Sequence, residues 1–216
     1  MAPRTKKGKF APLPEPPQPR GAIKLTKQDV VRRELATAIR LFVTGGDPVA
    51  VYVLASAASG IINPAGQAKN VDTWRVEYLD YIKDEYREAA EHMLDEPFNF
   101  MKHGKRDLSE ELTTFSPLIN NTLLFMLCRD YWRIYRATFP ELVVYMTLQI
   151  ALEPKLVKND DLGVFARWRE SVEGLAGTAQ LDLNAAAAAL TKFDEVAAQY
   201  PGALISSAEA VTKAPT

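Results

Sequence analysis

The chain of 216 residues is 47% hydrophobic and 25% charged, a composition that excludes wholesale disorder. Its formal net charge of −1 does not indicate general affinity for nucleic acid or for membrane surfaces. The single cysteine, Cys128, excludes an intrachain disulfide and a multi-cysteine metal site, and it fits a cytoplasmic protein.

Residues 1–20 contain six prolines and five basic residues against one acidic residue, Glu15. Such a segment cannot pack a core, so we predict that residues 1–21 form a disordered, basic, Pro-rich arm. The arm is either a solubilising tail or a contact for an acidic partner or nucleic acid. Residues 22–200 are expected to form one helical bundle domain, and residues 201–216 a flexible C-terminal tail.

The first two helices are predicted from their end signals. Thr26 and Asp29 resemble a capping box, and Gly45–Gly46 should end the helix that follows. Asp47 and Pro48 have the residue types of an N-cap and a first helical position. The next stretch, "VAVYVLASAASGII", is apolar or small on nearly every face, which indicates a buried central helix ending at "NPAG" (63–66).

Further helices are predicted over residues 72–94, from Ser116–Pro117, from Pro140, and over about 162–175 and 182–199. No strand-like alternation of any length appears. No apolar run approaches the roughly 20 residues that a membrane helix needs, so no membrane association is expected. The fold class predicted is therefore all-α, a single helical bundle of about five to seven helices that follows the disordered arm.

The candidate site lies in the stretch "EPFNFMKHGKRD" (96–107). On a helix, Asn99 and His103 would share one face. The basic neighbours of the imidazole would favour a bound anion, phosphate especially, and would lower the pKa of the imidazole. The candidate ligand-binding residues are Asn99, Lys102, Lys105, Arg106 and Asp107, with His103 as candidate general acid or base. The alternative is a histidine satisfied at a helix–loop corner by Asp107 or a backbone carbonyl.

Other chemistry has less support. Arg87 and His92 would lie about 140° apart on one helix, so they could not act together, and a solvated charged face explains them. No metal-ligand spacing appears, so neither a metal nor another cofactor is expected. Cys128 lies mid-way along an apolar helix and is interpreted as a core residue. In "RDYWRIYR" (129–136) we expect the aromatic rings to point inward and the arginines to line the rim, although base stacking is the alternative.

The order of "AIRLFVTGGDPVAVYVLASAA", "FNFMKHGKRD" and a long apolar helix resembles a group of uncharacterised bacterial helical proteins. More distantly, the arrangement is similar to the HEPN superfamily. That resemblance implies a helical bundle that dimerises and is either a metal-independent ribonuclease or a degenerate module that binds RNA or partners. His103 would be the motif histidine and Asn99 the polar residue beside the motif arginine. The arginine position itself is Phe98, which cannot hold a phosphate, so Lys102, Lys105 or Arg106 would have to supply that charge.

Three hypotheses of function follow. The leading one is a catalytically degenerate HEPN-like binding or interaction module, a homodimer, with RNA or a nucleotide as candidate ligand. The second is a metal-independent ribonuclease that uses His103. The third is a structural scaffold or protein–protein interaction domain that recruits a partner through its arm or tail.

Overall fold

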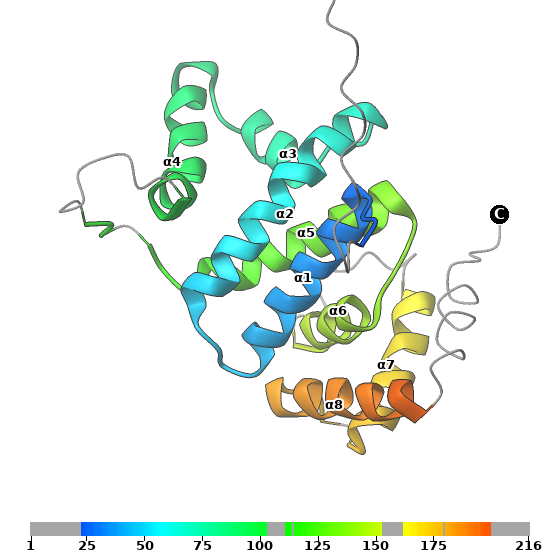
Figure 1. Cartoon of the computed structure of the whole chain (residues 1–216). Coiled ribbons are helices and arrows are strands. Elements are labelled where there is room, and N and C mark those ends of the chain that lie inside the picture. The colour runs from blue at the N-terminus through cyan, green and yellow to red at the C-terminus, as the bar shows by residue number, and fades with distance from the viewer. Residues whose placement is uncertain (1–22, 103–110, 114, 153–161, 179, 200–216) are drawn as a thin grey trace, which may run out of the picture.

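The computed structural model describes residues 23–102, 111–113, 115–152, 162–178 and 180–199. Within these ranges every regular element is a helix, which confirms the all-α prediction (Figure 1). The described residues contain eight helices rather than five to seven, because one predicted helix is two separate ones. The arm at 1–21 and the tail at 201–216 lie outside the described residues.

The first two helices begin as their caps predict. Helix α1 (Lys27–Val43) has a complete capping box, in which the Asp29 N–H donates to Thr26 Oγ1 at 3.1 Å and the Thr26 N–H donates to Asp29 Oδ2 at 3.0 Å. It ends before Gly45, whose φ of 67° suits glycine. Helix α2 (Pro48–Ala68) begins with Asp47 Oδ1 accepting from the N–H groups of Val49 and Ala50.

The predicted end of α2 at residues 63–66 is wrong, because the helix runs through Pro64 to Ala68. Proline removes one helical hydrogen bond, and the carbonyl that loses its donor belongs to Gly60, at an exposed position. The helix ends instead where Asn70 adopts a left-handed φ of 53° and the Val71 N–H donates to the Gly66 carbonyl at 2.9 Å. The loop that follows returns to the helix, because Thr73 Oγ1 donates to Asn63 Oδ1 at 2.9 Å.

The single helix predicted for residues 72–94 is also wrong. The chain forms a short helix α3 (Trp74–Asp80), turns at residues 81–83, and continues as α4 (Asp84–Lys102). Two acidic residues, Asp84 and Glu85, occupy the first turn of α4, where they favour a helix N-terminus. The apolar stripe expected on one long helix is therefore divided, and Tyr81 at the turn is 89% exposed.

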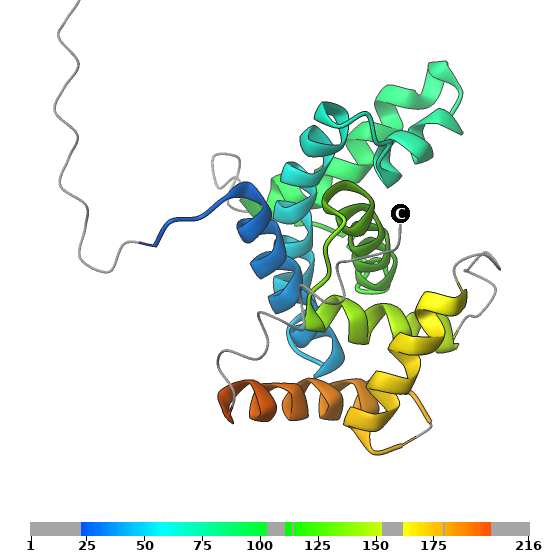
Figure 2. The same ribbon diagram turned by 90° about the vertical axis from the view of Figure 1, so that its right-hand side faces the viewer.

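The core is built by four helices and closed at one end by a pair. Helix α1 packs on α2, on α5 (Ile119–Tyr135) and on α6 (Pro140–Leu152). Helices α7 (Leu162–Ala176) and α8 (Leu183–Gln199) pack on each other and on α6. Figure 2 shows this pair at one end of the molecule and α3 with α4 at the other. Cys128 is fully buried in α5, as predicted.

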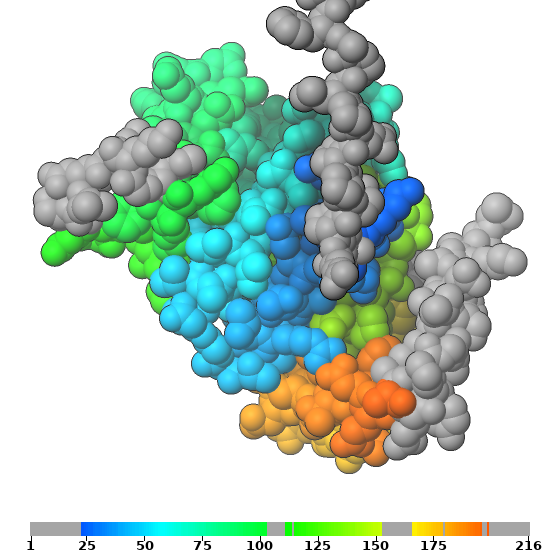
Figure 3. Space-filling model, viewed as in Figure 1, coloured from blue at the N-terminus to red at the C-terminus, as the bar shows by residue number. Residues whose placement is uncertain are grey.

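Helices α3 and α4 contribute little to that core. In α4 only Ala90 is buried, and in α3 only Leu79. Figure 3 shows α1 and α2 side by side on one face, with α4 and α8 at opposite edges. Because α4 leans on α2 with few buried side chains, a hollow remains between it and the body of the bundle.

Helix α2 corrects the expectation that no apolar run could span a membrane. Among the described helices it alone is long and apolar enough by length and composition, with a mean hydropathy of 1.4. Its buried residues Val51, Ala55, Ala58 and Ile62 belong to the core of the bundle. The arrangement is compatible with the central helix of a soluble protein.

Candidate functional site

The structure describes two of the six predicted site residues. Asn99 and Lys102 lie in the last turns of α4, and both are exposed. His103, Lys105, Arg106 and Asp107 lie outside the described residues. Their convergence around a histidine therefore stays a prediction.

The second histidine behaves as the charge pattern indicates. His92 is exposed on α4, and Arg87 pairs with Asp80 at 3.7 Å and with Asp84 at 3.6 Å. The turn before α4 brings Asp80 close enough for this pairing. The solvated charged face is confirmed.

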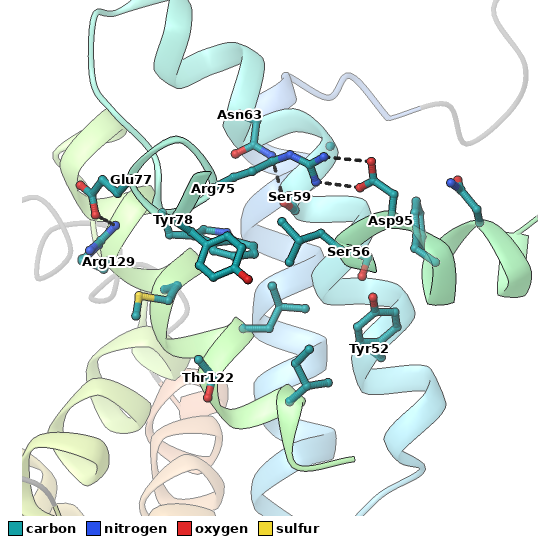
Figure 4. Close-up of a pocket in the computed structure, with 18 of the residues that line it drawn as sticks. Tyr52, Ser56, Ser59, Asn63, Arg75, Glu77, Tyr78, Asp95, Thr122 and Arg129 are labelled. Atoms are coloured by element: carbon teal, nitrogen blue, oxygen red, sulfur yellow. Dashed lines mark hydrogen bonds and ion pairs between the residues drawn. The ribbon is translucent and has the colours of Figure 1, made fainter. Parts of the chain in front are cut away.

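A pocket of about 600 Å³ lies between α2, α3, α4 and α5 (Figure 4). This volume lies within the range of pockets that bind small molecules or short peptide segments. Asn99 is one of its lining residues, so the predicted site and the pocket meet at the end of α4. The side chains that matter for its chemistry are five aromatic rings, several hydroxyl or amide groups and two ion pairs.

One wall is a single face of α2. Ser56, Ser59, Gly60 and Asn63 recur at spacings of three and four residues, which places them on one side of the helix. Asn63 Nδ2 donates to Ser59 Oγ at 3.2 Å, and Thr73 Oγ1 donates to Asn63 Oδ1 at 2.9 Å. A Cβ added at Gly60 would have no atom within 4 Å, so this part of the wall is open space.

The opposite wall, α3, is anchored to α5 by a buried carboxylate. Thr73 precedes α3 but makes no side-chain cap; instead the Trp74 N–H donates to Asp130 Oδ2 at 2.7 Å. Asp130 has no exposed surface, and Arg129 Nε donates to its other oxygen at 3.1 Å. Burial raises the pKa of the Asp130 carboxyl, although the Trp74 N–H and the charge of Arg129 act in the opposite direction.

The charged groups of the pocket are paired with one another. Arg75 forms a two-point pair with Asp95, at 2.7 and 2.9 Å, and so joins α3 to α4. Glu77 accepts from Arg129 at 2.9 Å and from Arg133 at 2.6 Å, and so joins α3 to α5 (Figure 4). The lining charges therefore sum to zero, and the lining has no arginine left over to select a phosphate.

Aromatic side chains supply most of the apolar surface. They are Tyr52, Trp74, Tyr78, Tyr81 and Phe98. The Trp74 and Tyr78 rings lie 6.4 Å apart, and Tyr78 points into the middle of the pocket (Figure 4). The indole Nε1 of Trp74 is shielded from solvent and has no hydrogen-bond partner among the described residues. The Trp74 ring therefore contributes an apolar surface to the pocket, while its buried N–H is an unsatisfied donor within the described part of the chain.

Lys102 lies on α4, one turn beyond Phe98. Its ammonium group is 5.4 Å from the centre of the Phe98 ring, which itself lines the pocket. Among the described residues Lys102 forms no ion pair, so its charge is available near the Asn99 end of the pocket. Of the basic residues predicted to form the site, Lys102 is the one that the structure describes.

The described residues supply no catalytic or metal-binding constellation elsewhere. Within them no three His, Cys, Asp or Glu side chains gather as metal ligands. Cys128 is buried, and burial raises the pKa of its thiol, so it is a poor nucleophile. In the 129–136 run Tyr131 is buried and Arg129 and Arg133 face Glu77, which confirms the prediction for that run.

Sequence reasoning missed the pocket. It interpreted "VAVYVLASAASGII" as a helix buried on nearly every face, but Ser59 is only half-buried and Gly60 is exposed. The available signal was the spacing of Ser56, Ser59 and Asn63, which puts polar groups on one face of an apolar helix. No protein-family model matches the chain, and no curated protein or solved structure matches it either.

Proposed function

We propose that this protein is a non-catalytic helical interaction module whose pocket binds an extended, proline-rich and basic peptide segment. The observation that carries the proposal is a pocket with aromatic walls whose own charges are already paired, set beside an acidic helix. The arginines of such a pocket are already paired and do not attract a free anion, whereas its aromatic rings offer a broad surface to an apolar ligand.

The aromatic lining supports proline as the principal contact. Proline-rich segments adopt the polyproline II helix, a preformed shape that docks in aromatic-lined grooves at low entropic cost. The backbone carbonyls of that helix have no internal hydrogen bonds and need donors. The hydroxyl groups of Ser56 on α2 and Thr122 on α5, which line the pocket, are suitable donors.

The charge around the pocket supports a basic ligand. Residues 74–102, which comprise α3, α4 and their connection, contain eight acidic residues against four basic ones, a net charge of −4. Glu91 lies one turn before Asp95 on the same face of α4, and it is exposed. Cationic side chains that flank the prolines would find carboxylates there.

Binding of RNA or a nucleotide is a second proposal, supported by Lys102 and Asn99 at one end of the pocket. The net charge of −4 on residues 74–102 opposes it, because that charge repels phosphates. The ribonuclease hypothesis depends on His103, outside the described residues, and stays a prediction. The HEPN-like relationship, the homodimer and the cytoplasmic location stay predictions as well.

The test is a titration of the full chain against three fluorescein-labelled probes, followed by fluorescence anisotropy. The probes are an oligoproline peptide with an arginine at each end, the same peptide with glutamates instead, and an oligouridylate. We expect the arginine peptide to bind, the glutamate peptide to bind at least tenfold more weakly, and the oligouridylate not to bind. Tight binding of the oligouridylate with no binding of either peptide would favour the RNA proposal and refute ours.

A further inference from the structure

We infer that the pocket is occupied in cis by the chain's own N-terminal arm, residues 1–22, which therefore inhibits binding of a partner peptide. This inference rests on the proposed function, because it names one occupant of the same pocket. Three independent observations support it: the sequence of the arm, its charge, and the place where the described chain begins.

The sequence of the arm matches the ligand chemistry derived from the pocket. Residues 10–20, "FAPLPEPPQPR", contain five of the arm's six prolines, and Pro14 and Pro17 are three residues apart. That spacing puts both rings on one side of a polyproline II helix, which has three residues per turn. Leu13 adds an aliphatic side chain among the prolines.

The charge of the arm complements that of the helices at the pocket. Residues 1–22 contain five basic residues and one acidic residue, a net charge of +4, against −4 for residues 74–102. Opposite charges of this size attract at low ionic strength and are screened by salt. The negative charge of residues 74–102 therefore favours the arm over a neutral proline-rich segment.

The arm is long enough to reach the pocket from where it joins the bundle. Gln28 near the start of α1 donates to the Tyr131 hydroxyl at 3.4 Å, and Tyr131 lies on α5 two residues from Arg129 of the pocket lining. The path therefore has to pass about one helix, whose diameter is about 10–12 Å. Nine residues, 18–26, separate Pro17 from α1 and span up to about 30 Å when extended, so the segment that ends at Pro17 can enter the pocket of the same copy.

Limited trypsin digestion of the full chain tests the inference, with cleavage of the Lys9–Phe10 bond as the readout. Gly60→Phe would place a ring in the pocket, and Gly174→Phe is the matched control: Gly174 is also an exposed helical glycine with no atom within 4 Å of an added Cβ. We expect Gly60→Phe to be cleaved at least threefold faster than wild type and Gly174→Phe to be cleaved at the wild-type rate. A second variant, with Pro14, Pro16 and Pro17 all changed to alanine, leaves the described bundle untouched and should be cleaved faster too.

The rate of trypsin cleavage and the affinity for the peptide both depend on the fraction of molecules in which the arm is docked. If the arm is docked with a ratio R of docked to free, trypsin cleavage slows by the factor 1 + R, and the apparent affinity for the arginine-flanked oligoproline peptide falls by the same factor. The triple-alanine variant should therefore bind that peptide more tightly by the factor by which its cleavage accelerates.

Equal cleavage rates in wild type, Gly60→Phe and the triple-alanine variant would overturn the inference. If, with equal cleavage rates, the peptide still bound in trans and Gly60→Phe abolished that binding, the proposed function would stand although the inference about the arm would not. Protection that increases with protein concentration would also overturn the inference as stated, because the arm would then come from a second copy.

Discussion

Replacing Gly60 by phenylalanine should stabilise the protein and abolish its binding of a proline-rich peptide. An added Cβ at Gly60 meets no atom within 4 Å, and the aromatic residues Trp74 and Tyr78 line the same pocket. Full burial of a phenylalanine side chain contributes roughly 1.5–3 kcal/mol, and a pocket that is open on one side should give about 1 kcal/mol of this. For a chain of this size, about 1 kcal/mol raises the Tm by about 2–4 °C.

The matched variant Gly174→Phe separates this gain from helix propensity. Both substitutions replace an exposed helical glycine, so both gain the same few tenths of a kcal/mol in propensity. We expect the Tm of Gly60→Phe, measured by differential scanning calorimetry, to exceed that of Gly174→Phe by about 2–4 °C. We also expect peptide affinity to fall at least tenfold, about 1.4 kcal/mol, in Gly60→Phe alone. Equal Tm values, or unchanged affinity in Gly60→Phe, would show that the hollow beside α2 is not a binding site.

Three further predictions concern the contacts that hold the pocket together. Asp130→Ala should lower the free energy of unfolding, measured in urea, by about 3 kcal/mol, because it leaves the Trp74 N–H and Arg129 without their buried acceptor. The control Asp182→Ala, which removes a half-buried helix cap, should lower it by about 1 kcal/mol. Equal losses would contradict the role of Asp130 as a buried anchor of α3. Burial raises the pKa of Glu77, but hydrogen bonds and charges from Arg133 and Arg129 outweigh burial, so the pKa is lowered overall from 4.5. Glu77→Gln should therefore reduce the free energy of unfolding by up to about 1 kcal/mol at neutral pH, and by nothing once the pH falls through the lowered pKa. A loss that does not depend on pH would argue against the ion pairs. Tyr145→Phe should cost about 1–2 kcal/mol in urea denaturation, because the buried hydroxyl donates at 2.7 Å to the Asn121 carbonyl, and a neutral result would mean that water replaces it.

Features set by local chemistry were predictable from the sequence. The capping box at Thr26, the Asp47–Pro48 start and the buried positions of α5 follow from side chains within a few residues of one another. Such signals depend on backbone donors and helical spacing that a linear sequence displays directly.

Features set by tertiary contacts were not predictable. Helix α2 continues through Pro64 because the loop after it closes a favourable C-terminal turn at Asn70. The start of α3 depends on Asp130, which is 56 residues away in the sequence. The pocket exists because α4 packs against the bundle with few buried side chains. The spacing of residues along one helix does not reveal how that helix packs on another.

The central claim, that a proline-rich peptide enters the pocket, is tested most directly by NMR of the tryptophan indole N–H groups. The chain has three tryptophans, and of these only Trp74 lines the pocket. On addition of the arginine-flanked oligoproline peptide, the Trp74 resonance, assigned with Trp74→Phe, should shift, because the Trp74 ring lines the pocket that the peptide enters. The resonances of Trp132 and Trp168 should stay in place. A Trp74 resonance that does not move while the peptide binds, or a shift confined to the other two, would contradict the account.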